Sequence, residues 1–278
     1  MKYRIVVTTE KETSLTLPQK EKFSGCLIGQ CLGDALGAPV EGHPMGVCEG
    51  YVDEILRTRR LDLLDQIDMP VGQYTDDSQL ARELLQSYVE QKRFNPSDYA
   101  SRIAAIFAEE RIVGRGQATE QAAFRLIEGV PWEESGTPSP SAGNGSAMRA
   151  GPIGLMFFDD PELMMKAAHD QGRITHQDAQ CSGGSVAIAG AVALALQPGT
   201  INTDDFVSQL VEWVSNYHQP FADYLLKLPE WLELSPPKAA RLISKIGDNP
   251  DYPGQWRWIS PYVVSSVLWS LYSFSQNP

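Results

Sequence analysis

The chain has 278 residues, 42% hydrophobic and 21% charged, so it can bury a full core and has an ordinary globular composition. Its formal net charge of −12 argues against a broad nucleic-acid-binding surface, which requires clustered Lys and Arg. An anionic ligand would therefore need local help, from a cation or from helix N-termini.

Cysteine usage and apolar runs indicate the compartment. The four cysteines form no C-x-x-C pair and no zinc-type spacing, which is typical of unreactive thiols in a reducing cytosol. The apolar stretch near the N-terminus, residues 3–7, is too short for a signal peptide, and we find no apolar run of membrane-spanning length. We therefore expect a cytoplasmic protein with no membrane partner.

The first predicted element follows a polar lead-in over residues 1–20. From Phe23 to Ala38 the pattern is helical, with a glycine at every fourth position from Gly25 to Gly37. Each interior glycine costs about 1 kcal/mol relative to alanine, so the stripe predicts close approach of a neighbouring helix or a ligand. Asp34 within the stripe argues against a membrane-type glycine zipper.

The rest of the chain alternates between apolar stripes of helical period and breaks. Helices are expected over 78–93, 99–110, 119–128, 161–170, 182–196, 203–217 and after Ser260-Pro261. Residues 131–145 form a Gly/Pro/Ser-rich loop of a kind that is often functional. Alternating strand patterns are almost absent, so we predict an all-α fold in which residues 21–278 make a single domain.

An acidic string, Thr75-Asp76-Asp77, comes just before a predicted helix. The ordinary interpretation is an N-cap followed by acids that the helix dipole favours. The functional interpretation is that Thr75 and both carboxylates are ligands of Mg²⁺. Adjacent acids are costly unless a cation neutralises them, which favours the second interpretation somewhat.

Two further strings leave alternatives open. Gly143-Asn144-Gly145 is either a turn or a cradle of backbone N–H groups for a diphosphate. His176 precedes a predicted helix, where a lone histidine is more often a capping or packing residue than a catalyst. Asp34 and Glu41 fit surface acids, with Arg149 as a partner for either of them.

Taken together and in this order, the strings resemble the ADP-ribosylglycohydrolase family, which includes dinitrogenase reductase-activating glycohydrolase. Four segments carry the resemblance: the glycine-striped helix with Asp34, Pro39 and Glu41; Gly72 to Ser78; Gly143 to Arg149 with Pro152-Ile153-Gly154; and Thr175-His176-x-Asp178. Four ordered motifs are far more specific than any one of them alone.

The resemblance implies an orthogonal multi-helix domain that hydrolyses the glycosidic bond of ADP-ribosylated protein side chains or related ADP-ribose conjugates. It implies a site with two magnesium ions, or manganese, held by Thr75, Asp76, Asp77 and Glu41. Glu41, Asp76 and Asp77 would be the catalytic carboxylates, and the sequence does not assign the role of general base to one of the three. The implied substrate-binding residues are Gly143, Asn144, Gly145, Ser146, Met148 and His176.

One departure from the family pattern concerns the C-terminus. The family's second metal motif, Asp-x-Asp-Thr, is absent before the chain stops at Pro278, so we expect a domain that lacks its last helices and half of its metal ligands. Asp204-Asp205 and Asp248-x-x-Asp251 are not expected to substitute. The alternative to a working hydrolase is therefore a member that binds ADP-ribose without cleaving it, and a purely structural role is a third.

Overall fold

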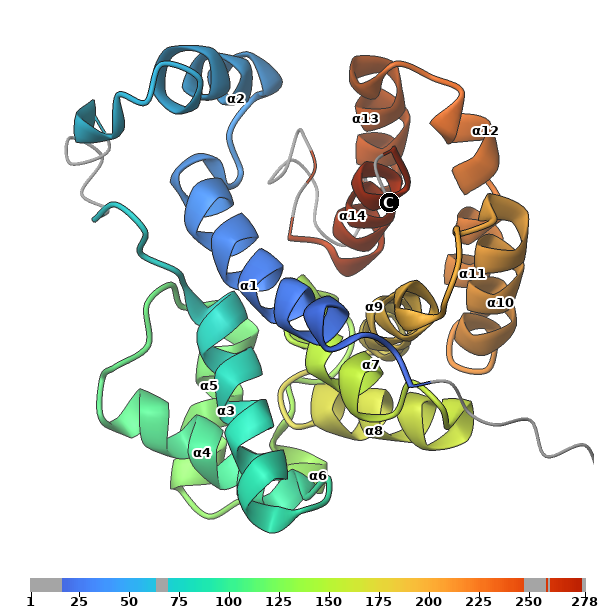
Figure 1. Cartoon of the computed structure of the whole chain (residues 1–278). Helices are drawn as coiled ribbons and strands as arrows, with labels where there is room; N and C mark the ends of the chain where they lie inside the picture. Colours follow the sequence, from blue (N-terminus) through green and yellow to red (C-terminus); the bar gives the residue numbers. More distant parts are fainter. Residues whose placement is uncertain (1–16, 64–69, 248–258, 260, 277–278) are drawn as a thin grey trace, which may run out of the picture.

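A computed structural model describes residues 17–63, 70–247, 259 and 261–276 (Figure 1). Within these ranges the secondary structure is helical and contains no strand, which confirms the all-α prediction. The α-helices are α1 (Lys20–Gly37), α2 (Met45–Tyr51), α3 (Asp76–Gln91), α4 (Pro96–Ala108), α5 (Gln117–Ile127), α6 (Trp132–Ser135), α7 (Gly151–Met156), α8 (Pro161–Arg173), α9 (Ala179–Leu196), α10 (Thr203–Ser215), α11 (Gln219–Leu225), α12 (Leu228–Leu232), α13 (Pro236–Ser244) and α14 (Val263–Gln276).

The predicted helices are present, with two local differences. The loop expected over 131–145 contains the one-turn helix α6. The last helix starts at Val263, so Pro261 is not its first residue. The reason is that the backbone before this helix pairs with the chain around Gly143-Asn144-Gly145, called the glycine loop below. Asn144 N–H donates to Pro261 O (2.7 Å), and Val263 N–H donates to Ala142 O (2.9 Å). Most of the lead-in, residues 1–16, and the acids at 248 and 251 lie outside the described residues.

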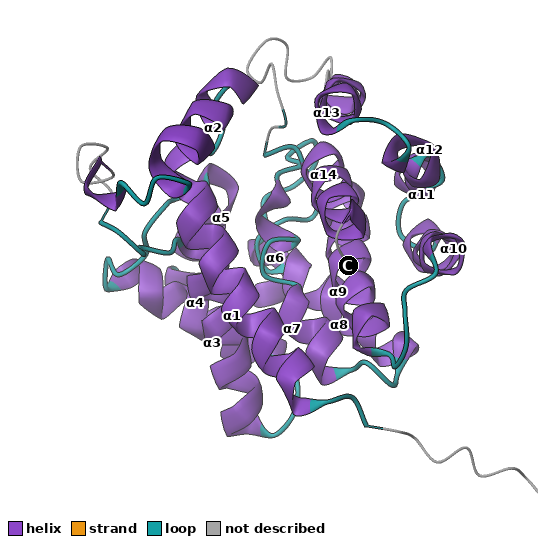
Figure 2. Ribbon diagram, turned by 45° about the horizontal axis from the view of Figure 1, so that its top comes forward, coloured by secondary structure: helices purple, strands orange, loops and turns teal. Residues whose placement is uncertain are grey.

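Helix α9 is the centre of the molecule, and α7, α8, α10 and α14 pack around it (Figures 1 and 2). Its sequence is apolar on every side, which is typical of a buried helix. The prediction that no apolar run reaches membrane-spanning length is wrong for α9, whose 18 residues meet that criterion by length and composition. In the fold, 67% of this segment is buried among the neighbouring helices, as expected for the core helix of a globular domain.

The crossing of α7 over α9 depends on Gly154. A Cβ atom at this position would overlap the carbonyl oxygen of Ala189 and lie 2.9 Å from Val192 Cβ. Because the obstacle includes backbone, we expect Gly154→Ala to lower the free energy of unfolding by about 2–3 kcal/mol in a urea titration. Gly25→Ala is the matched control: nothing lies within 4 Å of its added Cβ, so it should be neutral or stabilising by up to about 1 kcal/mol. Equal effects of the two substitutions would contradict this packing.

The glycine stripe of α1 does not meet a neighbouring helix. A Cβ added at any of its four glycines would have no atom of another segment within 4 Å, and no residue of α1 is buried. Of the two alternatives, close approach of a helix is therefore wrong within the described residues, whereas approach of a ligand stays a prediction, since Gly33 and Gly37 line a cavity. Large apolar side chains of α1 also remain exposed, Ile28 at 66% and Leu32 at 55%. By contrast, the apolar stripe expected on the last helix, from Val264 to Leu271, is buried as predicted.

The fold brings the four sequence motifs together. Helix α3 contacts α1 and α7, and the 3₁₀ turn Asn144–Ser146 contacts α8, α9 and α14. The acidic string at the start of α3 and the glycine loop before α7 are consequently neighbours, although about seventy residues separate them in the sequence.

Candidate active site

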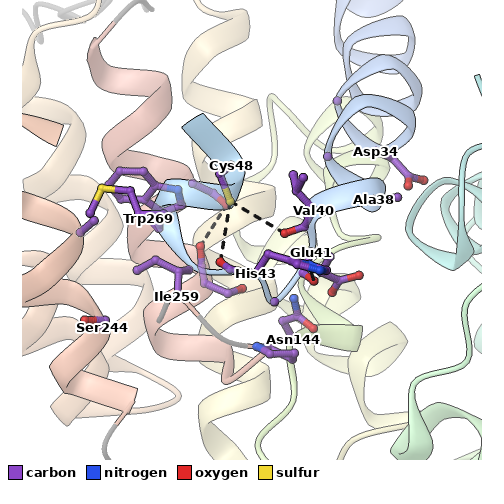
Figure 3. A pocket seen from close by; sticks show the side chains of 18 of the residues that line it. Asp34, Ala38, Val40, Glu41, His43, Cys48, Asn144, Ser244, Ile259 and Trp269 are labelled. Carbon is purple, nitrogen blue, oxygen red and sulfur yellow. Dashed lines mark hydrogen bonds between the residues drawn. The ribbon is translucent and has the colours of Figure 1, made fainter. Parts of the chain in front are cut away.

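Two adjoining cavities lie where these motifs meet. The smaller, of about 510 Å³, is lined by eight residues predicted for the site: Glu41, Asp76, Asp77, Gly143, Asn144, Gly145, Met148 and His176. The larger, of about 820 Å³, extends from the end of α1 to α13 and α14 and includes Thr75 in its wall. Glu41, Asp77 and Asn144 line both cavities, so they mark the junction. Figure 3 shows Glu41 and Asn144 on one side of the larger cavity, with Trp269 and Ser244 on the other.

Glu41, Asp76 and Asp77 form an acidic wall of the smaller cavity. The two aspartates lie in the first turn of α3, whose N-cap residue is Thr75. Asp34 of α1 accepts hydrogen bonds from the Thr75 amide (2.9 Å), the Thr75 hydroxyl (2.8 Å) and the Ser78 amide (3.1 Å). The side chain that satisfies the free N–H groups of α3 therefore comes from another helix, not from Thr75. Asp34 is thus not a simple surface acid, because it fixes the start of α3 against α1.

Negative charge is concentrated in this wall. Burial raises the pKa of Asp76 to about 8, with further contributions from the charges of Asp77 and Glu41. Burial also raises the pKa of Asp77 to about 7, helped by the charges of Asp34 and Glu41. The pKa of Glu41 is raised by loss of solvent and by Asp34, although its side chain is still exposed to the cavities. Carboxylates in such a group either hold protons or have their charge neutralised by a bound cation.

The donor chemistry of the wall fits a hard cation such as Mg²⁺, which prefers carboxylate and hydroxyl oxygens. Among the described residues, however, no three His, Cys, Asp or Glu side chains come together as a ligand set. Mg²⁺ is commonly bound by one or two carboxylates and completed by substrate phosphates and water. The wall therefore has oxygen donors of the type that such a cation binds, and water or substrate oxygens would have to complete its coordination.

The glycine loop faces the acidic wall across the smaller cavity. The Asn144 amide donates to Pro261 O, so this N–H takes no part in the cradle interpretation of the loop. The glycines have a different steric role. A Cβ at Gly143 would lie 3.3 Å from His176 Nε2, and one at Gly145 would lie 2.7 Å from His176 Cε1. The absence of side chains at these positions lets the imidazole approach the loop.

Two residues of the glycine-loop motif point away from the cavities. Ser146 is fully buried, and its hydroxyl donates to Cys181 O (3.0 Å). It is not part of either cavity wall, so the structure does not bring its side chain into the predicted site. Arg149 is also fully buried and donates to Gln171 and Thr175. Its expected pairing with Asp34 or Glu41 is therefore wrong.

Sequence reasoning missed part of the site. The segment from Gly114 to Thr119, which is the loop before α5 and the first residues of that helix, lines the smaller cavity, and Arg115 brings a positive charge to it. Gly114 has φ +72°, and a Cβ there would lie 3.0 Å from Asp76 Oδ1, so glycine allows this loop to pass the carboxylate. The string Gly114-Arg115-Gly116 between two predicted helices was the available signal. Gln30 was also missed: its amide donates to the carbonyls of Asp77 (3.2 Å) and Met148 (3.1 Å), joining the two motifs.

His176 is buried and electrically neutral. Burial, and then the charge of Arg149, lower its pKa to about 3. In the unfolded chain a histidine titrates near 6.5, so below that pH the unfolded state binds a proton that the folded state does not. The contribution of His176 to the free energy of unfolding should therefore fall by about 1.4 kcal/mol per pH unit from about pH 6.5 towards pH 3. We expect His176→Gln to reduce this slope in urea titrations at pH 7, 6 and 5.

The control for this prediction is His43→Gln, because His43 is exposed. It should leave the acid slope unchanged. Identical slopes for the wild type and His176→Gln would contradict a neutral, buried His176.

Comparison with known proteins agrees with this geometry. Residues 15–278 match the model of the family described as ADP-ribosylglycohydrolase. An uncharacterized protein of Archaeoglobus fulgidus is 29% identical over 232 residues, which cover 83% of this chain and 72% of that protein. The ADP-ribosylhydrolase ARH3 of Xenopus tropicalis is 32% identical over 197 residues, 69% of this chain and only 55% of that protein.

A solved structure of an ADP-ribosylglycohydrolase-related protein complex shows the same fold. Its TM-score is 0.62 at 24% sequence identity, over 92% of this chain and 75% of that one. The family model covers nearly the whole chain, and the motifs that carry the resemblance line adjoining cavities. The chain therefore belongs to the ADP-ribosylglycohydrolase family, whose members are glycosidic-bond hydrolases.

Proposed function

We propose that this chain hydrolyses the glycosidic bond of ADP-ribosylated protein side chains or related small ADP-ribose conjugates, with the help of Mg²⁺ or Mn²⁺. The observation that carries the proposal is the smaller cavity, where Glu41, Asp76 and Asp77 face the Gly143–Gly145 loop and His176. The name of the ARH3 relative, an ADP-ribosylhydrolase, supports the same class of substrate.

The residues of the cavity suit the chemistry of this reaction. Cleavage at an anomeric carbon develops positive, oxocarbenium-like charge, which a wall of carboxylates stabilises. A carboxylate beside the bound cation can take a proton from the attacking water, and Asp76 and Asp77 are two candidates for this role. Glu41 lies at the junction of the two cavities and is the third candidate for the base.

Binding an anionic diphosphate beside this wall needs positive charge. Thr75, Asp76, Asp77 and Glu41 would hold the cation, in agreement with the oxygen donors that line the two cavities. When bound, a magnesium ion would offset the charge of the cluster and polarise oxygen atoms of the substrate. Arg115, on the opposite loop of the smaller cavity, would add a second positive group.

The test is release of ADP-ribose from an ADP-ribosylated protein and from small conjugates, measured with Mg²⁺, with Mn²⁺ and with a chelator. We expect release that depends on the cation. Calorimetry with free ADP-ribose is run in parallel. Binding of ADP-ribose without its release under any condition would favour the non-catalytic alternative. The absence of both binding and release would contradict the proposed function.

A further inference from the structure

Behind the glycine loop lies a buried, positively charged side chain that the proposed reaction does not use. Arg149 is fully buried, and no ion pair joins it to a carboxylate within the part of the chain that the structure describes. Its Nε donates to Gln171 Oε1 (3.0 Å), and its Nη2 donates to Gln171 O (3.1 Å) and Thr175 Oγ1 (2.7 Å). Its guanidinium also lies 5.8 Å from the ring centroid of Tyr99. A buried charge without a counter-ion is costly.

The Thr175 hydroxyl connects this cation to His176. Thr175 is fully buried, and its Oγ1 lies 2.8 Å from His176 Nδ1. Because Arg149 can only donate, Thr175 Oγ1 is the acceptor in that hydrogen bond. The hydroxyl hydrogen then needs an acceptor of its own, and His176 Nδ1 is the one within reach among the described residues. The hydroxyl therefore donates to Nδ1, which must be the unprotonated nitrogen.

The other ring nitrogen, Nε2, consequently carries the hydrogen. It faces the glycine loop, where a Cβ at Gly143 would lie 3.3 Å away and one at Gly145 3.2 Å away. His176 lines the smaller cavity together with Asp76 and Asp77. In the described part of the chain, the hydrogen bond of His176 to a side chain is made by Nδ1 and not by Nε2. The arrangement thus presents one N–H donor to whatever occupies the cavity.

We propose that Arg149 and Thr175 are positioning residues that hold His176 as an Nε2–H donor to a phosphate or hydroxyl oxygen of the ligand in the smaller cavity. The identity of the ligand rests on the proposed function, whereas the assignment of the donor nitrogen does not. The guanidinium orients the Thr175 hydroxyl and disfavours a second positive charge on the imidazole. His176 is therefore a fixed donor rather than a proton-transfer group.

The first experiment reads the tautomer directly, without ligand. In protein labelled with ¹⁵N-histidine, two-bond ¹H–¹⁵N correlations distinguish protonated from unprotonated ring nitrogens. The chain has four histidines, and the signals of His176 are those that disappear in His176→Gln. We expect an unprotonated Nδ1 and a protonated Nε2 in the wild type and in Thr175→Ser, which keeps the hydroxyl. In Thr175→Val, which is close in shape but lacks it, we expect loss of this single tautomer.

The second experiment measures ADP-ribose binding by calorimetry with the same proteins, after thermal unfolding has shown that each is folded. We expect Thr175→Val to bind about tenfold more weakly, as for loss of one hydrogen bond to a charged or polar group, and Thr175→Ser to bind as the wild type does. A purely structural role of Thr175 would lower stability but leave the tautomer unchanged.

The outcomes separate the two proposals. A protonated Nδ1 in the wild type overturns the positioning role, even if Thr175→Val does not fold and even if ADP-ribose binds normally. The expected tautomer together with no ADP-ribose binding by the wild type overturns the proposed function, and with it the role of His176 as a donor to that ligand. Equal affinities of Thr175→Val and Thr175→Ser also overturn the positioning role.

Discussion

Asp77→Asn is expected to lower the rate of ADP-ribose release by about 100-fold or more. Asp77 lines both cavities at their junction and belongs to the group of like charges formed with Asp34 and Glu41. Loss of a carboxylate that acts as base or as cation ligand typically costs a factor of 10² to 10⁴ in rate, about 3–5 kcal/mol. Asparagine keeps the size of the side chain, so a folding defect is not expected. The rates are measured at saturating substrate with Mg²⁺.

A matched control removes one carboxylate elsewhere. Asp205 is exposed in the first turn of α10, where Asp205→Asn changes the net charge by the same amount. It should leave the rate within about twofold of the wild type, because a distant surface charge is screened by salt. If Asp77→Asn retained the rate of Asp205→Asn, Asp77 would have no part in the reaction.

The sequence predicted the helices and the gathering of the motifs well, because both follow from strong local patterns. Apolar stripes of helical period, proline breaks and capping residues located most of the helices to within a few residues. The acidic string and the glycine loop were identified by residue types that few structural roles require together. Their position at one cavity followed from the resemblance, since no local pattern relates segments so far apart.

Several of the incorrect predictions concern partners that are distant in the sequence. Asp34 appeared to be a surface acid because its partners, Thr75 and Ser78, lie more than forty residues away. Nothing in the local sequence shows that the Asn144 amide donates to Pro261, which comes after a long intervening stretch. Arg149 was paired with an acid on the grounds of charge, but the fold surrounds it with Gln171 and Thr175. Hydrogen bonds of this kind depend on the tertiary structure and leave no periodic signal in the sequence.

The contributions of the acidic wall and of the buried histidine to stability change with pH in opposite directions. The carboxyl groups of Asp76 and Asp77 hold their protons more tightly in the folded protein than in the unfolded chain, where an aspartate titrates near 3.9. His176 holds its proton less tightly. Any experiment that changes the pH therefore has to compare variants at each group.

Binding of a divalent cation to the acidic wall should depend on pH. Because the folded-state pKa values of Asp76 and Asp77 are raised to about 8 and about 7, their contribution to stability is fully present below about pH 4 and is lost as the pH rises through these values. Without a cation, we expect each group to lower stability by about 1.4 kcal/mol per pH unit as the pH rises from 5 to 7. Mg²⁺ competes with protons for the same oxygens, so it should raise the melting temperature by more at pH 8 than at pH 6. The double variant Asp76→Asn/Asp77→Asn should show neither the slope nor the response to Mg²⁺, and Asp205→Asn should show both. A response to Mg²⁺ that is the same in the double variant would place the cation elsewhere.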